Sequence, residues 1–312
     1  MTIFPSLRFD RVAATSFVAI ITLALLIPVA HAQQAYPSPE DAAAALATAV
    51  KTGTKRAMLK VLGKDAEDII ESGDDVADAE TRERLLSAYE AKHSIKAEGN
   101  KKATLVLGAD DFPFPIPLIN NRDGWAFDSA AGRLEILYRR IGRNELDAIQ
   151  TCLAFVDAEN EYADKDRTGD GAGVYAQRIA SSPGKKDGLF WRDDRDQSPL
   201  GELAAQAAAE GYEIGAEGGA PYHGYYYRIL KGQGPNAPGG ALNYVVKGKM
   251  IGGFALIAYP AEYGNSGVMT LMINHAGTVY QKDLGERTAV IAKRISLFDP
   301  DQTWKKVEVT NP

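Results

Sequence analysis

The spacing of apolar residues changes along this chain, and the change limits the folds that it can adopt. Between residues 129 and 163, apolar side chains such as Leu134, Leu137 and Ile141 recur every three or four positions, which predicts a long helix. Beyond residue 220 the apolar residues form short runs separated by turns such as Lys247-Gly248, which indicates antiparallel hairpins. Helices early and hairpins late, without regular alternation, predict an α+β protein.

The expected C-terminal sheet is packed on helices. Its predicted strands are Tyr222–Leu230, Leu242–Val246, Met250–Tyr259, Gly267–Ile273 and Thr278–Lys282. An Ala-rich helix is expected at Leu200–Gly211, and a helix at Glu286–Ile295 is expected to cover one face of the sheet.

Helix start and stop signals divide the first third of the chain. Ser38 and Thr54 are typical capping residues, and Gly53 and Gly63 are typical of helix ends. A third helix is predicted over Ala79–His93, followed by strands at Ala103–Leu107, Phe112–Ile119 and Trp125–Asp128. Pro recurs within 112–119, and because Pro cannot donate to a sheet ladder, this segment is expected to be an edge strand or an extended crossing. The order of these elements resembles the nuclear-transport-factor-2-like cone fold.

The long helix is expected to connect two domains. Gly142-Arg143-Asn144 predicts a kink within it, and we place the domain boundary there. The chain then divides into residues 1–32, an N-terminal α+β domain at 33–142 and a C-terminal α+β domain with the antiparallel sheet at 143–312.

Residues 1–32 have the features of a secretory signal peptide. Arg8 and Arg11 precede an uncharged apolar run at Ser16–Ala30, and Ala30-His31-Ala32 has the small residues that signal peptidase recognises. The run is short for a membrane span, although an uncleaved anchor is the alternative. We expect cleavage, export to the periplasm or beyond, and no membrane span in the mature chain.

Charge and cysteine content argue against several classes of function. The formal net charge is −6 without a block of Lys and Arg, which is unfavourable for binding nucleic acid or an anionic membrane. Cys152 is the only cysteine, so an intramolecular disulfide is impossible. Its apolar neighbours indicate a small buried side chain rather than a nucleophile or an intermolecular bridge. The chain has no CxxC or HExxH spacing for zinc.

An acidic loop after the long helix is the candidate metal site. Alternate positions carry oxygen side chains, at Asp164, Asp166, Thr168 and Asp170. Gly171 follows, as in a calcium-binding loop. Gln177 stands where a bidentate Glu closes such a shell, so calcium is expected to bind weakly. The alternative is a solvated turn, and no other cofactor is expected.

One histidine has neighbours suited to acid–base chemistry. In Pro221–Arg228 (PYHGYYYR), His223 could act as a general base beside Tyr225, with Arg228 orienting an anionic group. The alternative is the start of a strand whose aromatic residues alternate between core and rim. No Gly-x-Ser-x-Gly motif accompanies His223. The Gly-rich segment 232–240 lacks the Lys-Ser/Thr of a phosphate loop and indicates a hairpin loop.

Five unusual strings span most of the chain: Asp110–Pro117 (DDFPFPIP), Ile141–Leu146 (IGRNEL), Ser182–Gly188 (SPGKKDG), Tyr222–Arg228 (YHGYYYR) and Gly252–Tyr263 (GGFALIAYPAEY). Through them the chain resembles DUF2950, a family of exported bacterial proteins without an established activity. The resemblance implies a Gram-negative-type envelope. Residues 149–285 also resemble the globular part of type IV pilins, in which a helix leads into a Gly-Tyr-x-x-x-Tyr strand and then a Ser-Gly-Val strand. Here a whole domain precedes that helix, where a pilin has its membrane-spanning N-terminus.

Three functions follow from these patterns. The first is a non-catalytic envelope binding or assembly module whose Tyr-rich C-terminal sheet contacts a protein or glycan partner. The second is a periplasmic hydrolase with a site around His223, and the third is a pilin-like structural subunit. An exposed aromatic patch favours the first, a concave pocket at His223 favours the second, and association through the long helix favours the third. The sequence does not rank oligomeric states.

Overall fold

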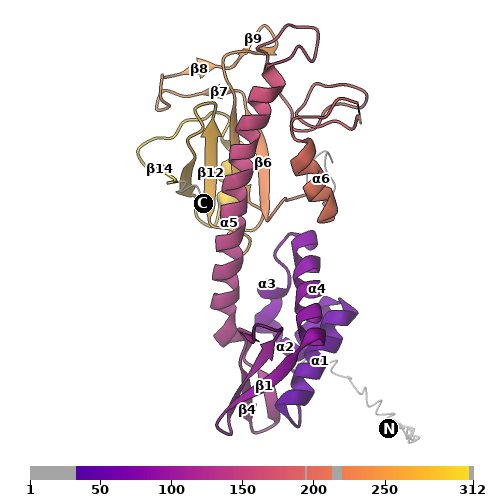
Figure 1. Ribbon diagram of the computed structural model, residues 1–312. Helices are drawn as coiled ribbons and strands as arrows, with labels where there is room; N and C mark the ends of the chain where they lie inside the picture. The colour runs from indigo at the N-terminus through magenta and orange to yellow at the C-terminus, as the bar shows by residue number, and fades with distance from the viewer. Residues whose placement is uncertain (1–32, 194, 213–219, 309–312) are drawn as a thin grey trace, which may run out of the picture. The chain divides into compact units, whose positions relative to one another are not determined.

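The computed structural model describes residues 33–193, 195–212 and 220–308 (Figure 1). These described residues form one compact unit, within which buried apolar side chains make two cores. The first core includes residues between Tyr36 and Phe127, and the second includes residues between Ala148 and Trp304. Helices and antiparallel sheets together confirm the α+β class. The boundary placed at residues 142 and 143 falls between the two cores and stays a prediction.

Helices cover one side of the first core: α1 (Pro39–Thr52), α2 (Lys55–Leu62), the short 3-10 turn η1 (Lys64–Ala66), α3 (Glu67–Ile70) and α4 (Asp75–Ala91). The predicted caps are confirmed, since the hydroxyls of Ser38 and Thr54 accept backbone N–H groups in the first turns of α1 and α2. The helix α4 begins earlier than predicted, because Asp74 caps it by accepting the N–H of Ala77.

The first core also contains an antiparallel sheet, made of β1 (His93–Glu98), β2 (Lys102–Leu107), β3 (Phe112–Pro113), β4 (Leu118–Asn121) and β5 (Gly124–Phe127). Its order is β1-β2-β4-β5, with β3 also pairing with β2. The strand β1 was not predicted from the sequence. Almost all its side chains are exposed, so its residues do not alternate between apolar and polar. The single strand predicted at 112–119 is instead β3 and β4, because the prolines between them cannot donate to a ladder.

The predicted long helix is α5, which runs over 35 residues from Ser129 to Ala163. Asp128 caps it by accepting the N–H of Ala131. The helix continues through Gly142–Asn144, so the expected kink does not interrupt it. Its C-terminal half, from Ala148 onward, supplies buried side chains to the second core.

The second core is built on a sheet of order β14-β13-β12-β11-β6, with every neighbouring pair antiparallel. Its strands are β6 (Tyr225–Leu230), β11 (Ala255–Pro260), β12 (Met269–Asn274), β13 (Tyr280–Asp283) and β14 (Lys305–Lys306). Two short ribbons flank it, β7 (Gly232–Gln233) with β8 (Leu242–Asn243) and β9 (Val245–Val246) with β10 (Lys249–Met250).

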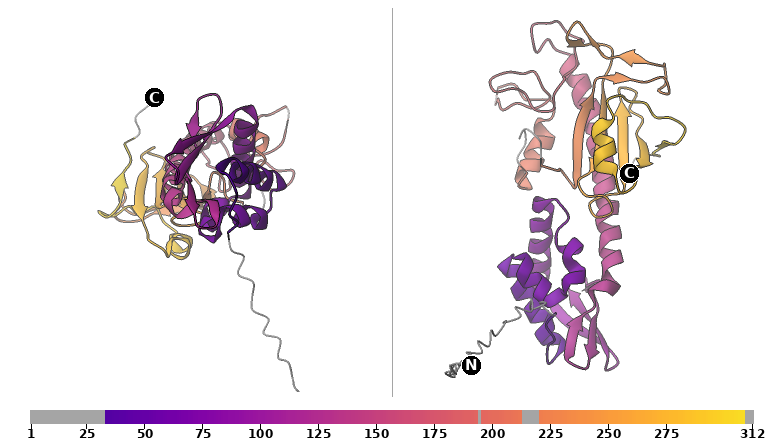
Figure 2. Two further views of the ribbon diagram at one scale, coloured as in Figure 1. Left: turned by 90° about the horizontal axis from the view of Figure 1, so that it is seen from below. Right: turned by 180° about the vertical axis from the view of Figure 1, so that it is seen from behind.

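Helices cover both faces of this sheet. The helix α5 packs on β11 and β12 and lies in front of the sheet in Figure 1, whereas α7 (Thr288–Arg294) packs on β11 and lies on the opposite face, as the view from behind in Figure 2 shows. The Ala-rich helix is α6 (Gly201–Ala209). Because both faces are covered, all six residues of β11 are buried. Among the described residues, no helix is long and apolar enough to span a membrane.

Buried polar side chains on the inner side of α5 link the two cores. The guanidinium of Arg140 donates to the carbonyls of Asp68 (2.8 Å) and Ile69 (2.6 Å) and to the side-chain oxygen of Asn265. Asn265 in turn donates to the carbonyl of Glu71 (2.8 Å), at the end of α3. These bonds satisfy carbonyls that α3 leaves free at its C-terminus. One side of the middle of α5 is therefore bonded to other parts of the chain and is not available to a partner.

Candidate functional site

His223 lies in the turn before β6, between two carboxylates from distant parts of the chain. Its Nε2 is 3.4 Å from a carboxylate oxygen of Glu210, which follows α6, and its Nδ1 is 3.7 Å from one of Asp147 on α5. Both distances are longer than those of a usual N–H···O hydrogen bond. His223 has a φ of 49°, in the left-handed region that few residues other than glycine adopt. The turn thus holds the imidazole between α5 and α6 at some backbone strain.

Tyrosines and a buried carboxylate support this turn. The ring of Tyr222 lies 4.1 Å from that of His223, and the hydroxyl of Tyr212 donates to Asp74 (2.9 Å). The same oxygen of Asp74 accepts the N–H of Gly224 (2.8 Å). Burial raises the pKa of Tyr212, and the nearby Asp74 carboxylate raises it further. Burial likewise raises the pKa of Tyr222 to about 12, so both phenols stay protonated near neutral pH.

The other two residues of the predicted acid–base set have structural roles elsewhere. Tyr225 is fully buried, and its hydroxyl donates to the carbonyl of Met269 (2.9 Å). Arg228 donates to the carbonyls of Ala292 (2.9 Å) and Ile295 (2.6 Å), and so caps the C-terminus of α7. Successive side chains of β6 face opposite sides of the sheet, and Tyr225 and Arg228 are three positions apart. The strand therefore directs Tyr225 and Arg228 to different surroundings, and neither one bonds to His223.

The acidic loop is folded around its own side chains. Asp166 accepts the N–H of Gly169 (2.7 Å), and the hydroxyl of Thr168 donates to Asp170 (2.9 Å). Lys249 lies 2.9 Å from Asp170 and, with Thr168, holds the pKa of that carboxyl below its usual value. Asp164 ends α5. Within the described ranges no three His, Cys, Asp or Glu side chains are grouped to hold a metal ion, and weak calcium binding stays a prediction.

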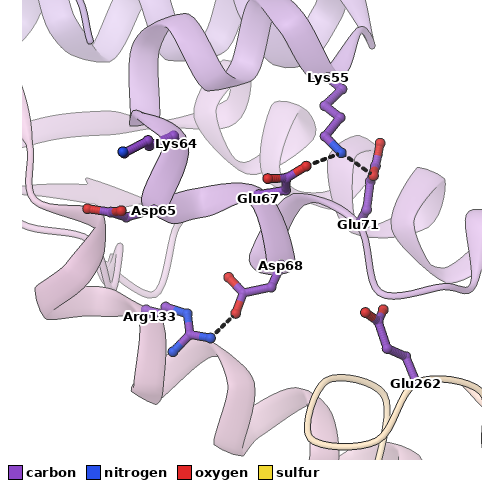
Figure 3. Close-up of a pocket in the computed structure, with 8 residues that line it drawn as sticks. All are labelled: Lys55, Lys64, Asp65, Glu67, Asp68, Glu71, Arg133 and Glu262. Carbon is purple, nitrogen blue, oxygen red and sulfur yellow. Dashed lines mark hydrogen bonds and ion pairs between the residues drawn. The ribbon is translucent and has the colours of Figure 1, made fainter. Parts of the chain in front are cut away.

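A charged cavity of about 440 Å³ lies beside α3, as Figure 3 shows. Its lining comes from Lys55, Lys64, Asp65, Glu67, Asp68, Glu71, Arg133 and Glu262. Lys55 pairs with Glu67 (2.6 Å) and Glu71 (2.7 Å), which raise its pKa to about 12, and Arg133 pairs with Asp68. The lining therefore has three basic and five acidic side chains, and three of the acids are held in ion pairs with Lys55 and Arg133.

The outer side of α5 exposes apolar side chains. Leu134, Tyr138 and Leu146 are 53%, 69% and 64% exposed, and Gly142 occupies the intervening position of the same four-residue spacing. We call Leu134, Tyr138, Gly142 and Leu146 the α5 row. Residues four apart on a helix lie on one side of it. The sequence pattern counted Leu134 among the periodic apolar positions of the long helix, and the structure shows that its side chain is exposed.

Comparison with known proteins identifies the family. The family model described as "Protein of unknown function (DUF2950)" matches residues 33–307. The chain belongs to the DUF2950 family. No curated protein and no solved structure matches it. For this DUF2950 protein the resemblance to pilins and to the nuclear-transport-factor-2-like cone therefore stays a prediction.

Sequence patterns singled out His223 in this DUF2950 protein but none of the acidic groups around it. Asp147, Glu210 and Asp74 lie far apart in the sequence and, taken singly, are ordinary charges at helix positions. The one available signal was the sequence His223-Gly224, which suits a turn that a buried carboxylate can bind. The exposure of the α5 row could not be predicted from the sequence, because its spacing is the same as that of a stripe that faces the core.

Proposed function

We propose that this DUF2950 protein is an exported, non-catalytic binding and assembly module of the bacterial envelope. The exposed α5 row is the observation that carries the proposal, with Tyr138 at 69% exposure near its centre. Large apolar side chains that are exposed along one side of a helix suit an interaction with a partner. Tyrosine suits such a site because it offers a large apolar body together with a polar tip.

The α5 row replaces the Tyr-rich sheet as the proposed binding surface. Tyr225 is fully buried and Tyr259 is 7% exposed, so these tyrosines belong to the second core. The large side chains of the α5 row are apolar apart from the Tyr138 hydroxyl, whereas a glycan must be held by many hydrogen bonds. The row therefore favours a protein partner over a glycan.

Two features support export. Residues 16–30 form an uncharged apolar run that ends in the cleavage pattern Ala30-His31-Ala32. Both features lie outside the described residues. The match to the family model begins at residue 33, directly after the expected cleavage position. Location in the periplasm or outside the cell is part of the proposal.

A hydrolase at His223 is the second candidate function, and the placement of the imidazole between Asp147 and Glu210 favours it. A nucleophilic hydrolase also needs a hydroxyl or thiol bonded to its base. In the described part of the chain, no Ser, Thr or Cys side chain bonds to the His223 ring, and the nearby Tyr212 hydroxyl donates to Asp74. Binding therefore accounts for the geometry better than hydrolysis does.

Photo-crosslinking in the native cell tests the proposal. A photoreactive amino acid replaces Tyr138 in the full chain, and the matched control carries it at Glu83, an exposed position on α4. We expect a discrete protein adduct from position 138 and none from position 83. The adduct should persist in His223→Gln, because binding at α5 does not need the imidazole. An adduct-free position 138, or equal labelling at both positions, would contradict the proposal.

A further inference from the structure

The two glycines of α5, Gly132 and Gly142, differ in how closely other residues pack against them. A Cβ at Gly132 would lie 2.7 Å from the Cα of Ile116, so contact within the chain requires that glycine. A Cβ at Gly142 would meet nothing within 4 Å. Glycine weakens a helix interior, and none of the described residues lies close enough to position 142 to require it. Gly142 therefore leaves an open depression on the outer side of the helix.

The α5 row is self-complementary when it is reversed. Its order is Leu134, Tyr138, Gly142, Leu146, with four residues between successive members. If a second copy of the row is turned end to end about residue 140, Tyr138 comes opposite Gly142 and Leu134 comes opposite Leu146. A large exposed ring then meets the open depression at both central positions. Side chains spaced four apart form the ridges that pack between helices.

We propose that the α5 row binds the α5 row of a second copy of this chain, with the two helices antiparallel about a two-fold axis near residue 140. The inference rests on the proposed function, because it names the partner of the same surface. Two-fold pairs are the commonest protein oligomers, and in them one surface patch meets itself. Each Tyr138 ring enters the depression at the partner's Gly142, and leucines close both ends of the contact.

The charges beside the row fit the antiparallel arrangement. Glu135 and Arg143 are both exposed on one flank of α5, and they carry opposite charges. In an antiparallel pair that flank faces its own copy, and Glu135 lies about 3 Å along the axis from the partner's Arg143. Arg139 lies nearest the two-fold axis, but its guanidinium pairs with Glu135 (2.6 Å) and lies 5.2 Å from the centre of the Phe112 ring. The like-charged Arg139 side chains are thus held towards their own chain, and each Glu135 carboxylate would lie between its own Arg139 and the partner's Arg143.

Exchanging the two central residues is the sharpest test of this register. Sedimentation velocity of the full chain over a concentration series compares the wild type with Tyr138→Gly, Gly142→Tyr and the double variant that carries both changes. We expect a concentration-dependent dimer for the wild type and roughly tenfold weaker dimerisation for each single variant. The double variant regenerates a ring opposite a depression and should recover dimerisation. Circular dichroism checks that every variant keeps its helix content.

Cysteine crosslinking tests the direction of the two helices. In Arg139→Cys the two introduced thiols lie about 3 Å apart along the axis, whereas in the control Gln150→Cys they lie about 30 Å apart. A short bismaleimide should therefore link Arg139→Cys and leave Gln150→Cys unlinked. The native Cys152 does not interfere, because it is fully buried and burial raises the pKa of its thiol to about 12.

Each result separates the inference from the proposed function. Equal crosslinking at both positions means parallel helices and overturns the inference, as does a double variant that stays as weak as the single variants. A protein that is monomeric at every concentration also overturns it. If position 138 still forms an adduct with a different protein in cells, the proposed function stands without the second copy. If position 138 forms no adduct with any protein, both the inference and the proposed function are contradicted.

Discussion

The strand β6 and the middle of α5 both carry large aromatic side chains, but those on the two elements differ in how far they are buried. Tyr225 on β6 is fully buried in a sheet that α5 covers on one face and α7 on the other. Tyr138 on α5 is 69% exposed, because the helix packs its inner side against the fold while Leu134, Tyr138 and Leu146 on the outer side stay exposed. Aromatic content alone therefore does not identify a binding surface. What matters is which apolar side the chain itself leaves uncovered.

The largest effect expected from this comparison is on stability at β6. Tyr225→Ala removes a fully buried ring and its hydrogen bond to Met269, and we expect the free energy of unfolding to fall by about 3–5 kcal/mol. Tyr138→Ala, the matched change on α5, should alter it by less than about 0.5 kcal/mol. Chemical denaturation of both variants measures the difference. Similar losses from the two changes would break the comparison.

The two sides of α5 can be compared at adjacent arginines. Arg140→Ala leaves the carbonyls of Asp68 and Ile69 without their buried donor, and we expect a loss of about 3 kcal/mol in unfolding free energy. Arg139→Ala removes an exposed pair with Glu135 and an exposed contact with the Phe112 ring, and should cost about 1 kcal/mol. Thermal and chemical unfolding give both values. An Arg139 effect as large as that of Arg140 would mean that the outer side is also part of the fold.

The buried half of α5 carries a pH-dependent group. Glu159 is fully buried, and burial raises its pKa well above 4.5 even though it accepts the N–H of Ala176. The folded state therefore binds a proton at Glu159 that the unfolded state releases. The contribution of Glu159 to stability is highest below about pH 4.5 and falls as the pH rises towards the raised pKa.

Removal of that carboxyl should remove the dependence. Glu159→Gln keeps an acceptor for the N–H of Ala176 but has no proton to lose. We expect it to match the wild type near pH 4 and to be more stable by about 1–3 kcal/mol at pH 8. Denaturation midpoints across this pH range measure the difference. Parallel pH curves for the two proteins would rule out Glu159 as the source.

The smallest expected effect is on stability, and it differs in sign between the two glycines of α5. Gly142→Ala should stabilise the monomer by about 1 kcal/mol, because alanine favours a helix and its Cβ meets nothing. Gly132→Ala should instead destabilise it, because the new methyl group would lie 2.7 Å from the Cα of Ile116. Melting temperatures in dilute solution, where association is absent, distinguish the two. A loss of stability in Gly142→Ala would reveal a contact at the outer side.

The sequence predicted local structure better than the surroundings of side chains. The caps at Ser38 and Thr54 and the whole of α5 follow from short-range patterns, and the structure contains them. The strand β1 and the exposure of the α5 row depend on which elements pack against them, and helical or strand periodicity carries no such information. Likewise His223 was visible as a residue type, but its neighbours Asp147 and Glu210 are brought to it by the packing of α5 and α6.

Oxidative footprinting of tyrosines tests the central claim most directly, because it reports both regions in one experiment. The full chain is labelled with hydroxyl radicals when dilute and when concentrated, and modification is read at Tyr138 and at Tyr225. We predict that Tyr138 is strongly modified in dilute protein and becomes protected as concentration rises, whereas Tyr225 stays unmodified throughout. Modification of Tyr225 in the folded protein, or a Tyr138 that is protected in the dilute monomer, would contradict the assignment of binding to α5.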